Sequence, residues 1–400
     1  MNVKTQNSVI DNLIGGDAQL LSKQLQRLRE KIFPPESKKA LRRFTSGETA
    51  KLIGVSDSYL RQLSLSKQGP VPETSASGRR LYTLEQVNAL RRFIAASQPE
   101  KQHQFVPHRS GDEHLQVIAV TNFKGGSGKT TTSVHLAQYL ALRGYRVLAV
   151  DLDPQASLSS LLGYQPEFDV QANETLYGAL RYDDQRRPLA EIVRKTYFDG
   201  LSVVPGNLEL HEFEHTTPQV LAEGRRAGGE LFFARVERAL SSVEENYDVV
   251  VIDCPPQLGF LTLSALCAAT SVLVTIHPQM LDVASMSQFL LMTSDLLKVV
   301  REAGGDLSFD FFRYIITRHE TNDGPQAQII AFLRSLFADR VLTNVALKST
   351  AISDAGLSKQ TIYEVDREGF SRSTYQRAIE SLDAVNGEVE ILIRRAWRRE

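Results

Sequence analysis

The sequence predicts an α/β protein with a mainly parallel sheet that is preceded by a small α-helical domain and an N-terminal helix. Apolar, β-branched runs alternate with helical patterns from about residue 114 onward, which is typical of a parallel sheet covered on both faces. A glycine-rich turn follows the first apolar run. A basic block with two short helical patterns lies N-terminal to that run. The predicted strands are 117–120, 146–153, 201–204, 248–253, 271–275 and 313–317, and the predicted helices are 131–143, 231–240, 285–300, 327–336 and 373–399.

The glycine-rich turn indicates a nucleoside triphosphate site. Residues 124–131 read Lys-Gly-Gly-Ser-Gly-Lys-Thr-Thr, which ends like a phosphate-binding loop and has an additional Lys at its start. Glycines allow a tight turn whose N–H groups approach the phosphates, and the following helix N-terminus adds partial positive charge. The motif predicts that Lys129 reaches the β- and γ-phosphates and that Thr130 binds Mg²⁺. The residues predicted to contact ATP here are Lys124, Gly125, Gly126, Ser127, Gly128, Lys129, Thr130 and Thr131.

Three carboxylates end two of the predicted strands. Asp151 and Asp153 follow the run that begins at 146, and Asp253 ends the run that begins at 248. Carboxylates at the C-terminal ends of parallel strands lie beside the phosphate crevice, where they hold Mg²⁺ or orient water. An aspartate after an apolar run is also a common turn residue.

Charge is unevenly distributed along the 400 residues. The chain has a net charge of −1, but residues 38–110 contain 13 Lys and Arg against 5 Asp and Glu, a net charge of +8, so the rest carries −9. A basic block on an otherwise acidic protein suggests a dedicated nucleic-acid module. The length predicts two or three domains, and the 42% hydrophobic content is enough for a sizeable core.

The basic block has the pattern of a helix-turn-helix. Thr45 or Ser46 would cap a first helix, Gly54 would make the turn, and Ser56 would cap a second helix. Leu60 and Leu63 would pack inward, which leaves polar side chains outward to face a major groove. Residues 78–83 would then form a basic strand beside the phosphates and begin a last helix at Thr83. The predicted DNA-binding residues are Ser58, Tyr59, Arg61, Gln62, Arg79 and Arg80. A purely structural helical hairpin is the alternative.

The remaining organisation follows from composition. Residues 17–33 form a candidate helix with Leu21, Leu25, Leu28 and Ile32 on one face, which would pack on a second copy or back on its own chain. Residues 97–113 are polar and suggest a linker. The predicted domains are therefore 1–36, an N-terminal helix with a possible dimerisation role, 37–96, the DNA-binding domain, 97–113, the linker, and 114–400, the ATPase domain.

Two further features bear on location. Cys254 and Cys267 lie in apolar surroundings and indicate buried thiols in a reducing cytosol, neither a disulfide nor a metal pair. The N-terminus has no signal-peptide pattern, and no apolar run is long enough to span a membrane, so we expect a cytoplasmic protein without a membrane partner.

The loop and the carboxylates together resemble the deviant Walker motifs of the ParA/MinD class of ATPases. In that class the first lysine, here Lys124, reaches across a nucleotide sandwich dimer to the partner's phosphates. The run Asp151-Leu152-Asp153-Pro154-Gln155 is similar to switch I of ParA proteins. The resemblance implies that Lys124, Lys129 and Asp153 are catalytic and that Thr130, Asp151 and Asp253 support the metal.

The resemblance covers the whole chain and extends to further residues. The segments 44–63 and 78–83 look like the MerR-like winged helix-turn-helix of partition proteins that repress their own operon, most like the RepA family of repABC plasmids. It implies that Thr317 and Arg318 contact the adenine, that His277 lines the pocket, and that Lys348 supports non-specific DNA binding.

The family implies a function with several partners. We expect a homodimer that forms on ATP and Mg²⁺, binds non-specific DNA on the nucleoid, binds an operator through the N-terminal module, and responds to a centromere-binding ParB/RepB-type protein. Two alternatives remain: a MinD-like membrane positioning ATPase, and a nucleotide-sensing repressor without a partition role.

Overall fold

The computed structural model describes residues 3–32, 39–66, 69–75, 78–223, 231–305, 307–366 and 369–399. It consists of two compact units, Met1–Ala40 and Leu41–Glu400. The first unit contains α1 (Val3–Ile32), and the second contains every other helix and strand. The predicted α/β class is confirmed.

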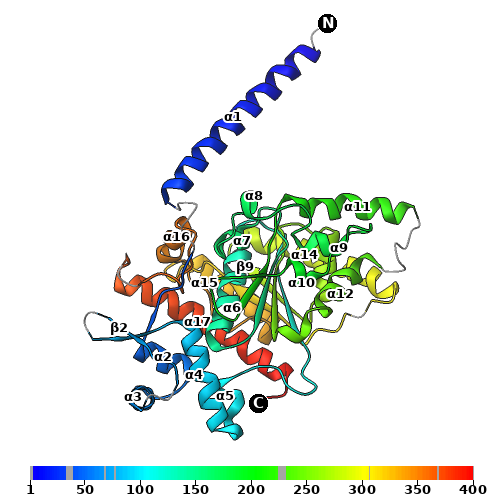
Figure 1. The fold of residues 1–400 in the computed structure, drawn as a ribbon. Coiled ribbons are helices and arrows are strands. Elements are labelled where there is room, and N and C mark those ends of the chain that lie inside the picture. Colours follow the sequence, from blue (N-terminus) through cyan, green and yellow to red (C-terminus); the bar gives the residue numbers. More distant parts are fainter. Residues whose placement is uncertain are drawn as a thin grey trace. The chain divides into compact units, whose positions relative to one another are not determined.

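A seven-stranded sheet forms the centre of the second unit (Figure 1). Its strand order is β10-β9-β4-β8-β5-β7-β6, and all neighbours are parallel except β6, which pairs antiparallel with β7. Each predicted strand is present within a few residues of its expected bounds. The strands are β4 (Gln116–Thr121), β5 (Val147–Asp151), β6 (Arg194–Lys195), β7 (Leu201–Val204), β8 (Val249–Asp253), β9 (Ser271–Ile276) and β10 (Phe311–Ile316).

Helices cover both faces of this sheet. They are α6 (Lys129–Arg143), α7 (Ser157–Leu161), α8 (Pro166–Asp169), α9 (Leu176–Leu180), α10 (Leu189–Ile192), α11 (His211–Ala222), α12 (Arg235–Ser241), α13 (Phe260–Ala268), α14 (Met280–Glu302), α15 (Gly324–Phe337), α16 (Thr350–Leu357) and α17 (Arg372–Ala396). Short 3₁₀ helices lie at Pro99–Lys101, Leu208–Leu210, Phe232–Ala234, Glu244–Asn246 and Ala338–Arg340.

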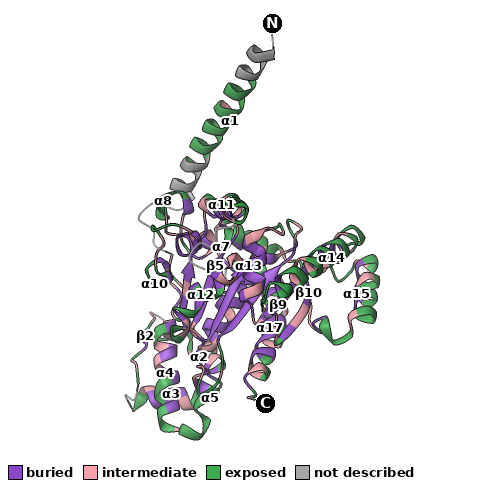
Figure 2. Cartoon of the chain, turned by 90° about the vertical axis from the view of Figure 1, so that its right-hand side faces the viewer, coloured by how far each residue is buried: buried purple, intermediate pink, exposed green. Residues whose placement is uncertain are grey.

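Alternate residues of each strand face two different cores. In β4, Ile118 and Val120 pack with α6 and α17 on one face, whereas Val117 and Ala119 pack with α12 and α13 on the other. Both sides of a strand are therefore apolar, as expected for a central parallel strand. Figure 2 shows the sheet as a buried layer and α14 as mainly exposed.

The N-terminal part of the second unit has two short helices joined by a turn, followed by a β-hairpin, where the sequence predicts a helix-turn-helix. Its elements are β1 (Phe44–Thr45), α2 (Ser46–Ile53), α3 (Asp57–Leu65), β2 (Glu73–Thr74), β3 (Arg80–Tyr82) and α4 (Leu84–Ser97). Thr45 and Thr83 make capping boxes with Glu48 and Gln86, and Gly54 takes the left-handed conformation that ends α2.

This small domain shares one core with the sheet. The side chain of Arg91, on α4, is buried and donates hydrogen bonds to the carbonyl oxygens of Leu52 on α2 (2.5 Å) and Leu142 on α6 (2.8 Å). The segment 97–113 contains α5 (Gln102–Phe105) with a buried Phe105, and Arg109 donates to the carbonyl oxygens of Tyr247 and Glu244. The expected linker is thus packed against both parts that it joins.

In the other unit, α1 starts at Val3, well before the expected position 17. Ile10, Leu13, Ile14, Leu20 and Leu21 are more than half exposed. The side chains of Leu25, Leu28 and Ile32, which were expected on the apolar face, lie outside the described residues, as does Phe33.

Among the described residues one helix, α14, is long and apolar enough to cross a membrane by length and composition alone. The apolar residues are interrupted by Ser, Thr and Gln, so they do not read as one run. Because α14 joins the adjacent parallel strands β9 and β10, it is a crossover helix on one face of the sheet.

Candidate nucleotide-binding site

The phosphate loop lies between β4 and α6, at the C-terminal end of a strand in the middle of the sheet. Gly126 and Gly128 have φ values of 76° and 89°, which other residues adopt only with strain. The predicted strand, loop and helix are therefore all in place. The N–H groups at the start of α6 carry partial positive charge next to the loop, which is the arrangement that binds phosphate.

Side chains from the neighbouring strand ends hold this loop from outside. The Thr317 hydroxyl donates to the Ser127 carbonyl oxygen (2.7 Å), and Arg318 Nη1 donates to the Gly126 carbonyl oxygen (2.8 Å). The Ser127 and Thr275 hydroxyl oxygens are 3.0 Å apart. Thr317 and Arg318, expected to contact the nucleotide, thus contact the backbone of the loop, and Arg318 does so with a φ of 54°.

Lys129 is buried at the first position of α6. Its Nζ donates to the Lys124 carbonyl oxygen (3.0 Å), so the ammonium bridges the inside of the loop. Burial lowers the pKa of Lys129, and the nearby carboxyl of Asp253 opposes that shift. The ammonium is therefore close to the position where the motif requires a cation for the phosphates.

Asp151 and Asp253 are register partners at the ends of β5 and β8. Ser159 donates to Asp151 from its backbone N–H (2.8 Å) and hydroxyl (2.7 Å), and the Ser133 hydroxyl donates to Asp253 (2.9 Å). The Thr130 side chain lies close to the Asp253 carboxyl. These contacts join two strands and the phosphate-loop helix into one polar cluster.

The two carboxyls share a site from which water is excluded. Burial raises the pKa of Asp151 to about 8, with the carboxyl of Asp253 adding to the shift, and burial raises the pKa of Asp253 to about 7. Asp253 Oδ2 is buried without a hydrogen-bond partner. A buried carboxylate pair with one free oxygen fits a divalent cation, because the cation would favour the charged form of both groups. Thr130, Asp151 and Asp253 are therefore together as expected.

Asp153 lies beyond the end of β5, near the Lys129 ammonium. Its carboxylate accepts a hydrogen bond from the Gln155 N–H (2.9 Å), and its own N–H donates to Asp151 (3.2 Å). The side chain is half-buried. It is thus at the edge of the cluster, on a turn that continues into α7.

Lys124 makes a contact that sequence reasoning missed. Its ammonium forms an ion pair with Asp282, in the first turn of α14. Asp282 also lies 3.2 Å from His277 Nδ1. Burial, together with the nearby Arg318 guanidinium, lowers the pKa of His277, which keeps the imidazole neutral at pH 7. His277 is therefore connected to the phosphate loop by Asp282, which contacts both His277 and Lys124.

The residues expected to contact DNA lie on three elements. On α3, Ser58, Arg61 and Gln62 are exposed, whereas Tyr59 is half-buried and packs on the core. On the hairpin, Arg79 is exposed and Arg80 is half-buried. Lys348 is exposed and pairs with Glu320 at 2.9 Å. The structure therefore leaves the polar surface of α3 open, as the pattern indicates.

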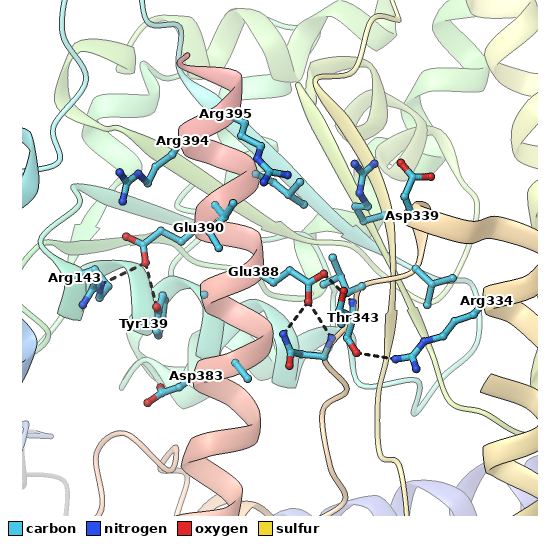
Figure 3. A pocket seen from close by; sticks show the side chains of 18 of the residues that line it. Tyr139, Arg143, Arg334, Asp339, Thr343, Asp383, Glu388, Glu390, Arg394 and Arg395 are labelled. Atoms are coloured by element: carbon cyan, nitrogen blue, oxygen red, sulfur yellow. Dashed lines mark hydrogen bonds and ion pairs between the residues drawn. The ribbon is translucent and has the colours of Figure 1, made fainter. Parts of the chain in front are cut away.

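A separate hollow lies between α17 and residues 338–344, away from the phosphate loop (Figure 3). There Glu388 accepts hydrogen bonds from the N–H groups of Thr343 (2.7 Å) and Asn344 (2.9 Å), and Glu390 pairs with Arg143 on α6 (3.3 Å). Glu388 and Glu390 are thus already engaged in fixing α17 to neighbouring parts of the second unit.

Several polar residues of the site carried no signal in the sequence. Ser133 follows Lys129 by one helical turn, a spacing that could have indicated a second hydroxyl on the same face. Ser159 bonds to Asp151, eight positions before it. Thr275 and Asp282 are remote in sequence from the loop that they contact, and the topology of the sheet brings them there.

These features define a class of protein. A phosphate loop at the end of a central parallel strand, with Lys and Thr at the helix start and carboxylates on neighbouring strands, is the site of a P-loop nucleotide hydrolase.

Comparison with known proteins narrows the class. The sequence profile of the AAA domain family matches residues 115–303. A protein of Sinorhizobium fredii designated a replication protein A is 56% identical over 97% of this chain and 95% of its own length. Protein SopA of Escherichia coli is 31% identical over 91% of this chain and 92% of its own length. The chain therefore belongs to the ParA-type family of partition ATPases, most like the repABC-type replication A proteins.

Solved structures agree on the fold. A structure described as a partition protein superimposes with a TM-score of 0.65 at 19% identity, over 94% of this chain and 98% of that one. An ATP complex of McdA from Cyanothece gives a TM-score of 0.55 at 19% identity, over 70% of this chain and 97% of that one. At this level of identity the likeness shows that the fold is shared.

Proposed function

We propose that this partition ATPase binds ATP with Mg²⁺, dimerises on the nucleotide, binds DNA without sequence preference as a dimer, and represses its own operon through α3 and the hairpin. The observation that carries the proposal is the presence of two lysines, Lys124 and Lys129, on one phosphate loop. Lys129 binds the nucleotide of its own subunit. The Lys124 side chain is 40% exposed, and it can contact a second subunit once its ion-pair partner Asp282 releases it.

The residues have distinct roles in this proposal. The loop N–H groups and Lys129 bind the phosphates, and Thr130, Asp151 and Asp253 hold Mg²⁺, which neutralises phosphate charge. Asp153 orients the attacking water from the end of β5. Lys124 of each subunit pairs with the other's phosphates, because two like-charged nucleotides gain two further cations in the closed dimer. Opening after hydrolysis would release the DNA.

The partners follow from the same proposal. A centromere-binding ParB/RepB-type protein would stimulate a slow hydrolysis, and Lys348 would contribute to the non-specific DNA surface. We place the protein in the cytoplasm on the nucleoid. A MinD-like membrane role is less well supported, because α14 is a crossover of the sheet and Trp397, near the C-terminus, is buried.

A gel-shift comparison tests the proposal as a whole. The promoter of the parent operon and random DNA are each titrated with ATP, ADP and no nucleotide. We expect random DNA to bind only with ATP and to weaken steeply with salt, and the promoter to bind specifically in one nucleotide state. A protein that binds the promoter but neither hydrolyses ATP nor binds random DNA would be a repressor without a partition role.

Asp153→Ala is expected to slow ATP hydrolysis by roughly 10²-fold or more, since an orienting group for the nucleophile is lost. ATP affinity should change little, because Asp153 lies outside the loop. The dimer should therefore accumulate with ATP, which light scattering would detect. Asp184→Ala, an exposed carboxylate outside the site, is the control. Hydrolysis at the parent rate would remove Asp153 from the mechanism.

Arg61→Ala is expected to weaken promoter binding by ~1–3 kcal/mol if the side chain reads a base edge. Binding of random DNA with ATP should not change, because that surface belongs to the ATPase dimer. Arg92→Ala is a matched control, since Arg92 is an exposed arginine of the same basic block on α4. Equal loss of both DNA activities would contradict a model with two DNA surfaces.

A further inference from the structure

The Lys124–Asp282 ion pair joins two segments that are 158 positions apart, the phosphate loop and the first turn of α14. Its two sides differ in burial, because the Lys124 side chain is 40% exposed and the Asp282 side chain is 7% exposed. We propose that Asp282 is a positioning residue that holds Lys124 in the unpaired subunit and so opposes closure of the dimer. This inference rests on the proposed function.

The ion pair lies at a place where Lys124 can exchange Asp282 for another partner. Lys124 begins the loop, its N–H donates to Asn122 (3.0 Å), and its ammonium extends outward to Asp282. Met280 and Leu281, in the same helical turn as Asp282, are 67% and 78% exposed. The pair is therefore at the molecular surface, with its carboxylate side inserted into the protein.

The Lys124 ammonium has two possible anionic partners, and it can contact only one of them at a time. One ammonium cannot lie against Asp282 and against the phosphates of a second subunit at the same time. When Lys124 leaves, the buried carboxylate loses its ion-pair partner and keeps the His277 imidazole as a neighbour at 3.2 Å. An uncompensated buried carboxylate is unfavourable. The ion pair thus stabilises the open subunit relative to the closed dimer.

The consequence is a threshold for dimerisation. A contact that exists only in the open subunit shifts the equilibrium away from the closed dimer. The size of the shift is the free energy that the contact contributes to the open state. ATP binding alone would not remove the contact, because the inner cation for the subunit's own nucleotide is Lys129. Dimerisation would then require a protein concentration high enough to offset the lost pair, which keeps isolated subunits open.

Asp282→Asn tests the inference, because it removes the charge and keeps the size of the side chain. With ATP, the variant is expected to dimerise at a protein concentration at least about fivefold lower than the parent, as measured by analytical ultracentrifugation. ATP affinity should stay within twofold. Asp295→Asn, an exposed carboxylate on the same helix, is the matched control. The melting temperature of each variant checks that the fold is intact.

A second measurement tests the Lys124–Asp282 contact without requiring the protein to dimerise. Acetylation of Lys124 by a small anhydride is followed by mass spectrometry on dilute protein without nucleotide, with Lys298 as internal reference. We expect acetylation of Lys124 to be several times faster in Asp282→Asn than in the parent or in Asp295→Asn. An unchanged rate, or a variant that dimerises no more readily than the parent, overturns the inference. If the parent does not dimerise with ATP, the proposed dimer itself is wrong, and the acetylation rate alone decides whether Asp282 holds Lys124.

Discussion

Replacing Lys129 by Ala is expected to abolish measurable nucleotide binding. The ammonium is buried inside the loop, 3.0 Å from the Lys124 carbonyl oxygen, whereas the Arg318 guanidinium contacts the loop from outside, at the Gly126 carbonyl oxygen. Hydrogen bonds to charged groups contribute about 1.5–3 kcal/mol each, and Lys129 is expected to make more than one to the phosphates. We therefore expect an affinity loss of roughly 10²-fold or more by isothermal titration.

The folded state should survive this change. Burial already lowers the pKa of Lys129, so removing the ammonium also removes an unfavourable desolvation. The control is Lys298→Ala, an exposed lysine on α14. Tight ATP binding by a folded Lys129→Ala protein would mean that the loop holds phosphates with its backbone alone.

The central strands and the phosphate loop were predictable because their signals are local. Apolar runs between turns define β4, β5 and β8, and Gly126 and Gly128 are at the positions where the backbone needs a positive φ. The caps of α2 and α3 were equally clear, since Thr45 and Ser56 bond within four residues of themselves. Local chemistry of this kind depends little on the rest of the fold.

Charge counting, in contrast, overestimated the DNA-directed part of the basic block. Arg91 and Arg109 belong to the 13 basic residues of 38–110, yet both bond to backbone carbonyls inside the second unit. Net charge cannot distinguish a solvated arginine from one that joins two elements. For the same reason, the sequence suggested a separable module where the structure has a shared core. Removing residues 1–104 would uncover apolar side chains of α6.

Contacts between distant segments were also beyond sequence reasoning. Asp282 reads as an ordinary acidic residue in the first turn of a helix, where the dipole favours it. Its contact with Lys124 depends on β4 and β9 being neighbours in the sheet. Strand order is set by packing of whole elements, so no local pattern reveals it.

Lys124→Ala is the change that separates the two lysines of the loop. We expect ATP affinity to remain within a few-fold of the parent, because Lys124 points outward to Asp282 and Lys129 stays in the loop. ATP-dependent dimerisation and hydrolysis should be lost, since the phosphates of the second subunit lose a cation. Sedimentation and phosphate release, measured with saturating ATP, check both expectations.

The comparison with Asp282→Asn makes this result diagnostic. Both variants break the same ion pair, so a purely structural pair would give the same outcome in each. If Lys124 acts on a second subunit, the outcomes are opposite: Lys124→Ala prevents dimerisation and Asp282→Asn promotes it. The double variant should behave like Lys124→Ala, because releasing a lysine has no effect once the lysine is gone. Normal hydrolysis by Lys124→Ala would show that this lysine is only a surface residue.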